Sequence, residues 1–134
     1  MEDGKWKVDY SDCARFECDF MTRITDDIRS SIIDEVELLA SAEKQLEYER
    51  KSPEVDVPVE IISVYVDDLF NLKSKPFIDS FSEQELKLLA ELLGRLCVAA
   101  DAIERAEYKT MAEVLKLPEW RSLMNFCKDL ADNL

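Results

Sequence analysis

Acidic side chains at helical spacing are the groups of this sequence that come nearest to a catalytic arrangement. Asp101, Glu104 and Glu107 recur every three residues in a pattern typical of a helix, so they are expected to share one helix face. The adjacent Asp67 and Asp68 could face them across a helical bundle. Carboxylate oxygens are the ligands that Mg²⁺ and Mn²⁺ prefer, and such a cluster could hold a metal ion at the phosphates of a nucleotide.

Arg105 favours a simpler interpretation of the same acids. It follows Asp101 by four residues, which is the spacing of an ordinary ion pair on a helix surface. A solvated helix face therefore explains the cluster better than a metal site does, and we expect neither a metal nor a cofactor. A metal-dependent all-α nucleotide hydrolase that uses Asp101, Glu104 and the Asp67-Asp68 pair is kept as an alternative.

The chain has no histidine among its 134 residues, which removes the commonest general base. Nucleophilic sites of the Ser-His and Cys-His kinds are therefore excluded, and we expect no catalytic residues and no enzyme activity. The cysteines follow no short paired spacing, and each lies in an apolar helical pattern. This predicts buried, reduced thiols rather than disulfides or zinc ligands at Cys13, Cys18, Cys97 and Cys127.

The net charge of −13 restricts the partners that the protein can bind. Contacts to phosphate supply most of the affinity for nucleic acid, so direct binding to nucleic acid is disfavoured. No apolar run approaches the roughly 18 residues of a membrane span, and no secretory signal is recognisable, so we expect a cytoplasmic protein that binds no membrane. Residues 1–67 hold 18 acids and 8 bases, and residues 68–134 hold 12 and 9, so the net charges of the two halves are −10 and −3.

Hydrophobic periodicity predicts an all-α fold, a single domain over residues 1–134 that forms a bundle of four to five helices. Two glycines and four prolines are too few for the turns of a many-stranded β fold. Ser82 and Glu85 have the spacing of a capping box, and Thr110 can cap a short helix. The helices are expected over residues 11–51, 57–73, 82–107, 110–116 and 118–132.

Some segments leave alternatives open. Residues 1–10 alternate between apolar and polar side chains, which suits an extended arm or one strand of a small two-stranded ribbon with residues 55–59. Residues 11–51 form either one long helix or two helices that meet near residues 22–26, where Thr25 can cap a second start. Gly94 costs a helix about 1 kcal/mol relative to alanine, so it indicates close approach of a neighbouring helix.

The expected helix over residues 11–51 carries acidic residues on one side and an apolar stripe on the other. A row of carboxylates could meet a basic partner, although it could equally serve only to keep the protein soluble. Aromatic side chains near the row are candidate anchors, and Tyr65 and Trp120 are further candidates, although Trp120 is expected in the core. The candidate partner-binding residues are Asp12, Asp19, Asp26, Asp27, Asp34, Glu37, Tyr48 and Trp6.

These features favour a non-catalytic, acidic cytoplasmic protein that inhibits or neutralises a basic protein partner. An immunity protein or antitoxin that faces a nuclease or toxin is the typical case, and an inhibitor of a nucleic-acid enzyme is a close relative. The second hypothesis is a homodimeric helical adaptor or secretion chaperone, whose acidity only keeps it soluble. The metal-dependent hydrolase is the third.

Overall fold

Helices are the regular elements in the part of the chain that the structure describes. The computed structural model describes residues 10–107 and 110–134, with side chains from residue 22 onward. No strand occurs within these ranges, so the all-α prediction is confirmed, while the helix count exceeds the four to five expected. The elements are α1 (Tyr10–Ala40), α2 (Ala42–Lys51), α3 (Val57–Ser63), the π-helical segment η2 (Val64–Leu69), α4 (Lys75–Asp79), α5 (Glu83–Ala106), α6 (Met111–Val114) and α7 (Pro118–Asn133).

The long pattern over residues 11–51 is divided at Ser41 and not near residues 22–26. Thr25 does not cap a second helix, because its hydroxyl donates a 2.9 Å hydrogen bond to the carbonyl of Thr22 inside α1. Ser41 has an extended backbone instead, and its hydroxyl accepts the N–H of Lys44 at 3.1 Å. The N-cap of α2 therefore lies sixteen residues beyond the predicted point of division.

The segment expected as a helix over residues 57–73 ends earlier and changes its winding. Its α-helical part, α3, has Pro58 in the first turn, and the wider π-helical turns of η2 follow directly to Leu69. The prediction of a strand over residues 55–59 is wrong, because the fixed φ of proline suits the first helical turn and its nitrogen cannot donate to a sheet. The extended arm over residues 1–10 lies outside the described residues, apart from Tyr10, which begins α1.

Capping interactions set the starts of the later helices. In the predicted capping box, the backbone N–H of Ser82 donates to Glu85 Oε1 at 2.8 Å and the N–H of Glu85 donates to Ser82 Oγ at 3.1 Å. Thr110 caps α6 in the same way. Ser74 caps the short helix α4, which is not among the helices expected from the sequence.

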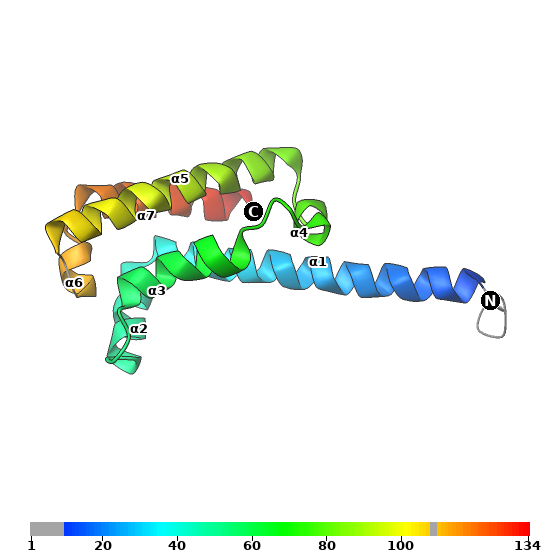
Figure 1. Ribbon diagram of the computed structural model, residues 1–134, viewed down its shortest axis with the longest axis horizontal. Coiled ribbons are helices and arrows are strands. Elements are labelled where there is room, and N and C mark those ends of the chain that lie inside the picture. Colours follow the sequence, from blue (N-terminus) through cyan, green and yellow to red (C-terminus); the bar gives the residue numbers. More distant parts are fainter. Residues whose placement is uncertain (1–9, 108–109) are drawn as a thin grey trace.

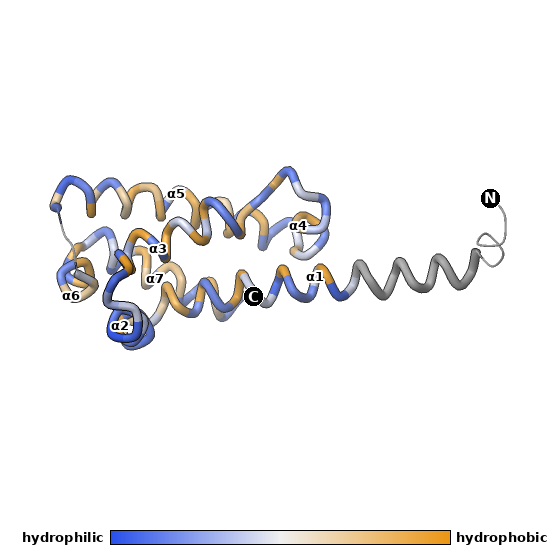
Figure 2. Tube along the Cα trace, turned by 60° about the horizontal axis from the view of Figure 1, so that its bottom comes forward, coloured by the Kyte–Doolittle hydropathy of each residue, from blue (hydrophilic) through white to orange (hydrophobic). Residues whose placement is uncertain are grey.

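The core lies where α7 packs against α1 and α5, and α3 with η2 joins them from one side (Figure 1). Trp120 is fully buried, as expected from the sequence, and so is Tyr65, whose hydroxyl donates to the carbonyl of Leu89 at 2.7 Å. Helix α2 is almost wholly hydrophilic (Figure 2). Within the described ranges, no helix combines the length and the apolar character needed to cross a bilayer. Buried residues from α1, α5 and α7 include Ile32, Val36, Leu39, Leu89, Leu92, Leu96, Leu123 and Leu130.

Candidate functional site

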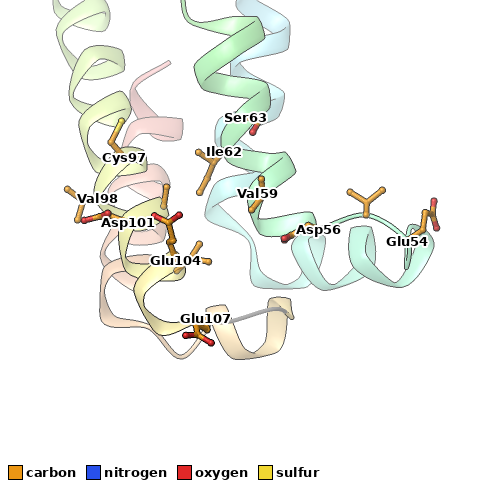
Figure 3. A pocket seen from close by; sticks show the side chains of 13 residues that line it. Glu54, Asp56, Val59, Ile62, Ser63, Cys97, Val98, Asp101, Glu104 and Glu107 are labelled. Carbon is orange, nitrogen blue, oxygen red and sulfur yellow. The ribbon is translucent and has the colours of Figure 1, made fainter.

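A groove of about 1020 Å³ opens between α3 and α5 (Figure 3). One wall is α3 with the loop that precedes it, and the other wall is the C-terminal half of α5. The residues that line it are Glu54, Val55, Asp56, Val59, Ile62, Ser63, Cys97, Val98, Ala100, Asp101, Ile103, Glu104 and Glu107.

The floor of the groove is apolar and partly open to solvent. Ile62 points from α3 toward α5 (Figure 3), and it belongs with Ile103 to the edge of the hydrophobic core. Val59 on α3 is 48% exposed and Val98 on α5 is 57% exposed. Val59 lines the groove from α3, and Val98 lines it from the side of α5 that is turned away from α3 (Figure 3). Isolated exposed apolar residues are common on proteins, but two valines that line one hollow together with core residues form a surface suited to a partner.

Acidic side chains stand on both rims of this floor. Glu54 and Asp56 lie on the α3 side, whereas Asp101, Glu104 and Glu107 lie along and just after α5 (Figure 3). Among the described residues that line the groove there is no lysine or arginine. The groove therefore combines an apolar floor with a uniformly negative rim, and such an environment attracts cationic groups.

Arg105 forms the ion pair that the sequence predicted, with 3.8 Å between its Nε and Asp101 Oδ2. Both side chains are well exposed, so the pair contributes little to stability. Its guanidinium offsets the negative charge of Asp101, whereas the carboxylates of Glu104 and Glu107 add negative charge to the same wall.

The acids that the hydrolase hypothesis joined are divided between two hollows. Asp101 and Glu104 line the groove, whereas Asp68 lines a separate hollow of about 260 Å³ together with Asp27 of α1. Within the described ranges, no three Asp, Glu or Cys side chains come close enough to hold a metal ion.

The end of α5 is held by local contacts that the sequence does not make obvious. Glu107 ends the helix in the left-handed conformation (φ 57°), which glycine or asparagine more commonly occupies. Beyond it, the carboxylate of Glu49 accepts the N–H of Met111 at 2.8 Å and ties the start of α6 to α2.

The acidic side of α1 is exposed where side chains are described. Of the apolar stripe expected opposite these acids, Leu39 is buried and Ile28 packs against the core, whereas Leu46 is 40% exposed. The exposed acids are Asp26, Asp27, Asp34 and Glu37. The side chains of Asp12 and Asp19, and the whole of Trp6, lie outside the described residues.

The aromatic anchors expected beside α1 are only partly available. Tyr48 is half-buried against the core, and Tyr65 is fully buried and so cannot be an anchor. The burial of Tyr65 could not be predicted from the sequence. Its β-branched neighbours fit a helix, but the side of this helix that faces the core could not be assigned without the rest of the fold.

Two residues of α5 differ from their predicted surroundings. Gly94 meets no atom within 4 Å of the position that a Cβ would take, so the prediction of a closely approaching helix is wrong. It lines a second hollow of about 660 Å³ between α5 and α7, which shares Val98 with the groove. Cys97 is exposed rather than buried, because it lies on the outer side of α5, whereas Cys127 is buried as predicted. The side chains of Cys13 and Cys18 are not described.

Glu35 is a buried acid that does not line the groove. It is 6% exposed, and its Oε2 atom has no hydrogen-bond partner among the described residues. Burial raises its pKa to about 8, because an ionised carboxylate is poorly stabilised away from water. Burial also raises the pKa of Cys127 to about 12, with a further contribution from the nearby Glu35. We interpret this cluster as part of the interior.

Comparisons with known proteins found no match to a family model, to a curated protein or to a solved structure. The function therefore has to be inferred from the groove, whose floor and rim are the features of this surface best suited to a partner.

Proposed function

We propose that this protein is a non-catalytic binding protein that neutralises a basic protein partner, and that the groove between α3 and α5 binds this partner. The observation that carries the proposal is the pairing of exposed Val59 and Val98 with acids on both rims of one hollow. A nuclease or toxin is the kind of partner that such a protein would neutralise, in the manner of an immunity protein, an antitoxin or an inhibitor of a nucleic-acid enzyme.

The two parts of the groove have different roles in this binding. Complementary charge at the rim accelerates encounter with a basic surface and orients it, and this contribution weakens as salt screens the charges. The floor supplies affinity, because apolar side chains buried at the centre of an interface provide most of its binding energy. A surface with only one of these parts would bind less selectively.

The groove is favoured over the acidic side of α1 because the described side chains of α1, from residue 22 onward, do not supply the second part. Within the described ranges, none of the exposed large hydrophobic residues lies on α1. Asp26, Asp27 and Asp34 are exposed there, which is the expected appearance of a solubilising face, and the hollow of about 260 Å³ that Asp27 lines is much smaller than the groove. We therefore expect the carboxylates of α1 to add long-range attraction only.

Two charge-reversal variants separate these surfaces. One variant carries Glu54→Lys, Asp101→Lys and Glu104→Lys in the groove. The matched control carries three acid-to-lysine changes on α1, at positions 26, 27 and 34, and so has the same net charge. Each immobilised protein is incubated with lysate of its native cell at low salt and eluted with a salt gradient.

The wild type and the α1 variant are expected to retain the same basic protein, and the groove variant is expected to lose it. If the groove variant retained the basic protein and the α1 variant lost it, the binding surface would lie on α1 and not in the groove. If the wild type retained no basic protein, the proposed function would be wrong.

A helical adaptor or secretion chaperone is the second candidate function, because the exposed valines of the floor would also suit an unfolded client. This candidate predicts a homodimer, whereas two copies that met through the groove would bring their acidic rims together. Sedimentation equilibrium over a range of protein concentrations distinguishes the two. A dimer that persists when Val59 and Val98 are both changed to serine would favour the adaptor, with its dimer interface elsewhere.

A further inference from the structure

The walls of the groove offer few backbone hydrogen bonds to an occupant. Apart from residues 54–56, the first turn of α3 and Glu107, the lining residues lie inside α3 and α5, where their backbone groups are already paired. Within the described ranges there is no strand whose free edge an extended peptide could join. An extended occupant would therefore bury N–H and C=O groups without partners, whereas a helix satisfies its own.

The pattern of apolar and acidic residues matches one face of a helix. Val59 and Ile62 are three residues apart on α3, so they form one short ridge along that wall. Val98 and Ile103 contribute apolar surface from α5. Acids lie on both walls of the groove, with Glu54 and Asp56 on the α3 side and Asp101, Glu104 and Glu107 on the α5 side (Figure 3).

Resting on the proposed function, we propose that the groove binds one amphipathic α-helix of the partner, whose apolar stripe is flanked on both sides by lysine or arginine. The apolar stripe covers Val59, Ile62 and Val98. The cationic residues on one flank reach Glu54 and Asp56, and those on the other flank reach the acids of α5. Ridges of side chains on a helix pack into the grooves between the ridges of its neighbours in this way.

A second copy of this chain does not fit the groove. Its net charge of −13 and its own acidic rims would place like charges face to face. Nucleic acid is disfavoured for the same reason, since its phosphates would meet the rim. A simple cation would satisfy the rim but leave the valines exposed. A basic amphipathic helix satisfies both parts of the surface.

Three synthetic peptides of about 18 residues, long enough for a helix of about 27 Å, test this inference. All have the same composition of leucine, lysine and glutamine. The first places lysines on both flanks of a leucine stripe, the second places them opposite the stripe, and the third alternates leucine and lysine as a strand would. Fluorescence anisotropy measures the affinity of each labelled peptide, and circular dichroism measures the helix gained on binding.

The flanked peptide is expected to bind about tenfold more tightly than either of the others and to gain helix as it binds. On the protein, Val59→Ser together with Val98→Ser is expected to weaken its binding about tenfold. The matched control is Leu72→Ser together with Ile78→Ser, which removes two exposed apolar side chains outside the groove and should leave the affinity unchanged.

Equal binding of the three peptides would overturn the inference, and so would equal binding of the flanked peptide to the wild type and the groove double variant. Failure of the proposed function has a different signature. In that case the groove charge-reversal variant retains the same cellular proteins as the wild type, whatever the peptides do. Because the four serine positions are exposed, the unfolding transition of each variant should match the wild type, and this comparison verifies that the fold is intact.

Discussion

The indole N–H of Trp120 donates a 3.1 Å hydrogen bond to the side-chain oxygen of Gln45 inside the core. The amide nitrogen of the same glutamine donates to the carbonyls of Leu38 and Leu39, at 2.9 and 3.1 Å. Those carbonyls belong to the last turn of α1, whose carbonyls have no partner within the helix. Gln45, in the first turn of α2, therefore caps the end of α1 and joins both helices to α7.

Replacing Gln45 with leucine should destabilise the fold strongly. The change leaves the Trp120 N–H buried without a partner and removes the side-chain donor to the carbonyls of Leu38 and Leu39, of which that of Leu38 still accepts the N–H of Ser41 at 3.2 Å. We expect the free energy of unfolding, measured by urea denaturation, to fall by about 1–3 kcal/mol. Gln84→Leu, at an exposed position in the first turn of α5, should change it by less than about 0.5 kcal/mol. If both changes lowered the free energy of unfolding equally, the buried hydrogen bonds of Gln45 would contribute no more stability than an exposed glutamine does.

Glu35 should make the fold less stable as the pH rises. Its pKa in the folded protein is about 8, above the ordinary value of 4.5, so the folded state holds its proton more tightly than the unfolded state does. The associated stability is complete below about pH 4.5 and is lost as the pH rises through 8. Glu35→Gln should remove this loss, so that its advantage over the wild type grows by roughly 1 kcal/mol per pH unit between about pH 5 and 8.

Glu37→Gln is the matched control for this titration. It removes an exposed acid two residues further along α1 and should leave the pH dependence of unfolding close to that of the wild type. Parallel stability curves for the wild type and Glu35→Gln would show that the buried carboxyl does not titrate in this range.

Arg29 and Glu85 should supply stability that acid removes. The guanidinium donates to both carboxylate oxygens, at 3.0 and 2.7 Å, and also to the carbonyls of Ser80 and Leu134. The hydrogen bond from Arg29 is the main reason that the pKa of Glu85 falls to about 2. Because this pKa is lowered, the stability is present above about pH 4.5 and is lost as the pH falls toward 2.

Arg29→Met should therefore lower the free energy of unfolding at pH 7 by about 1–3 kcal/mol and flatten its fall in acid. Lys75→Met breaks an exposed ion pair and should change the free energy by less than about 1 kcal/mol. If the free energy of unfolding of Arg29→Met fell in acid as steeply as that of the wild type, this prediction would be contradicted.

Gly94→Ala should stabilise the protein. The Cβ position faces open space, so alanine improves helix propensity without a clash, and we expect a gain of about 0.5–1 kcal/mol in thermal or urea unfolding. Ala90→Gly, one turn earlier at another exposed position of α5, should produce a loss of similar size. A destabilised Gly94→Ala would mean that another part of the chain covers this position.

Local signals in the sequence were sufficient for part of this fold. The capping box at Ser82 and the capping residue Thr110 predicted the starts of α5 and α6, because each cap forms within four residues. The division at Ser41 has a local part, the cap of its hydroxyl on the N–H of Lys44, and this spacing was not distinguished from other possible caps in the long pattern. The other part is not local, because Gln45 beside this division is joined to Trp120, 75 residues away in the chain.

The groove shows the same limit. The sequence predicted the exposed face and ion pair of Asp101, but not its position across from Asp56, since that requires the packing of α3 beside α5. The sequence does contain one signal for the exposed face of α5. Gly94, Val98 and Asp101 are spaced by four and three residues, so they share a face of α5, and the charged member indicates that this face meets solvent.

The footprint of the basic partner on this chain tests the central claim most directly. Amide chemical shifts of the isotopically labelled protein, recorded with and without the purified partner at physiological salt, give that footprint residue by residue. The groove account predicts that the largest changes fall in residues 54–63 and 97–107. Changes concentrated in residues 26–37, with the groove segments unaffected, would contradict it.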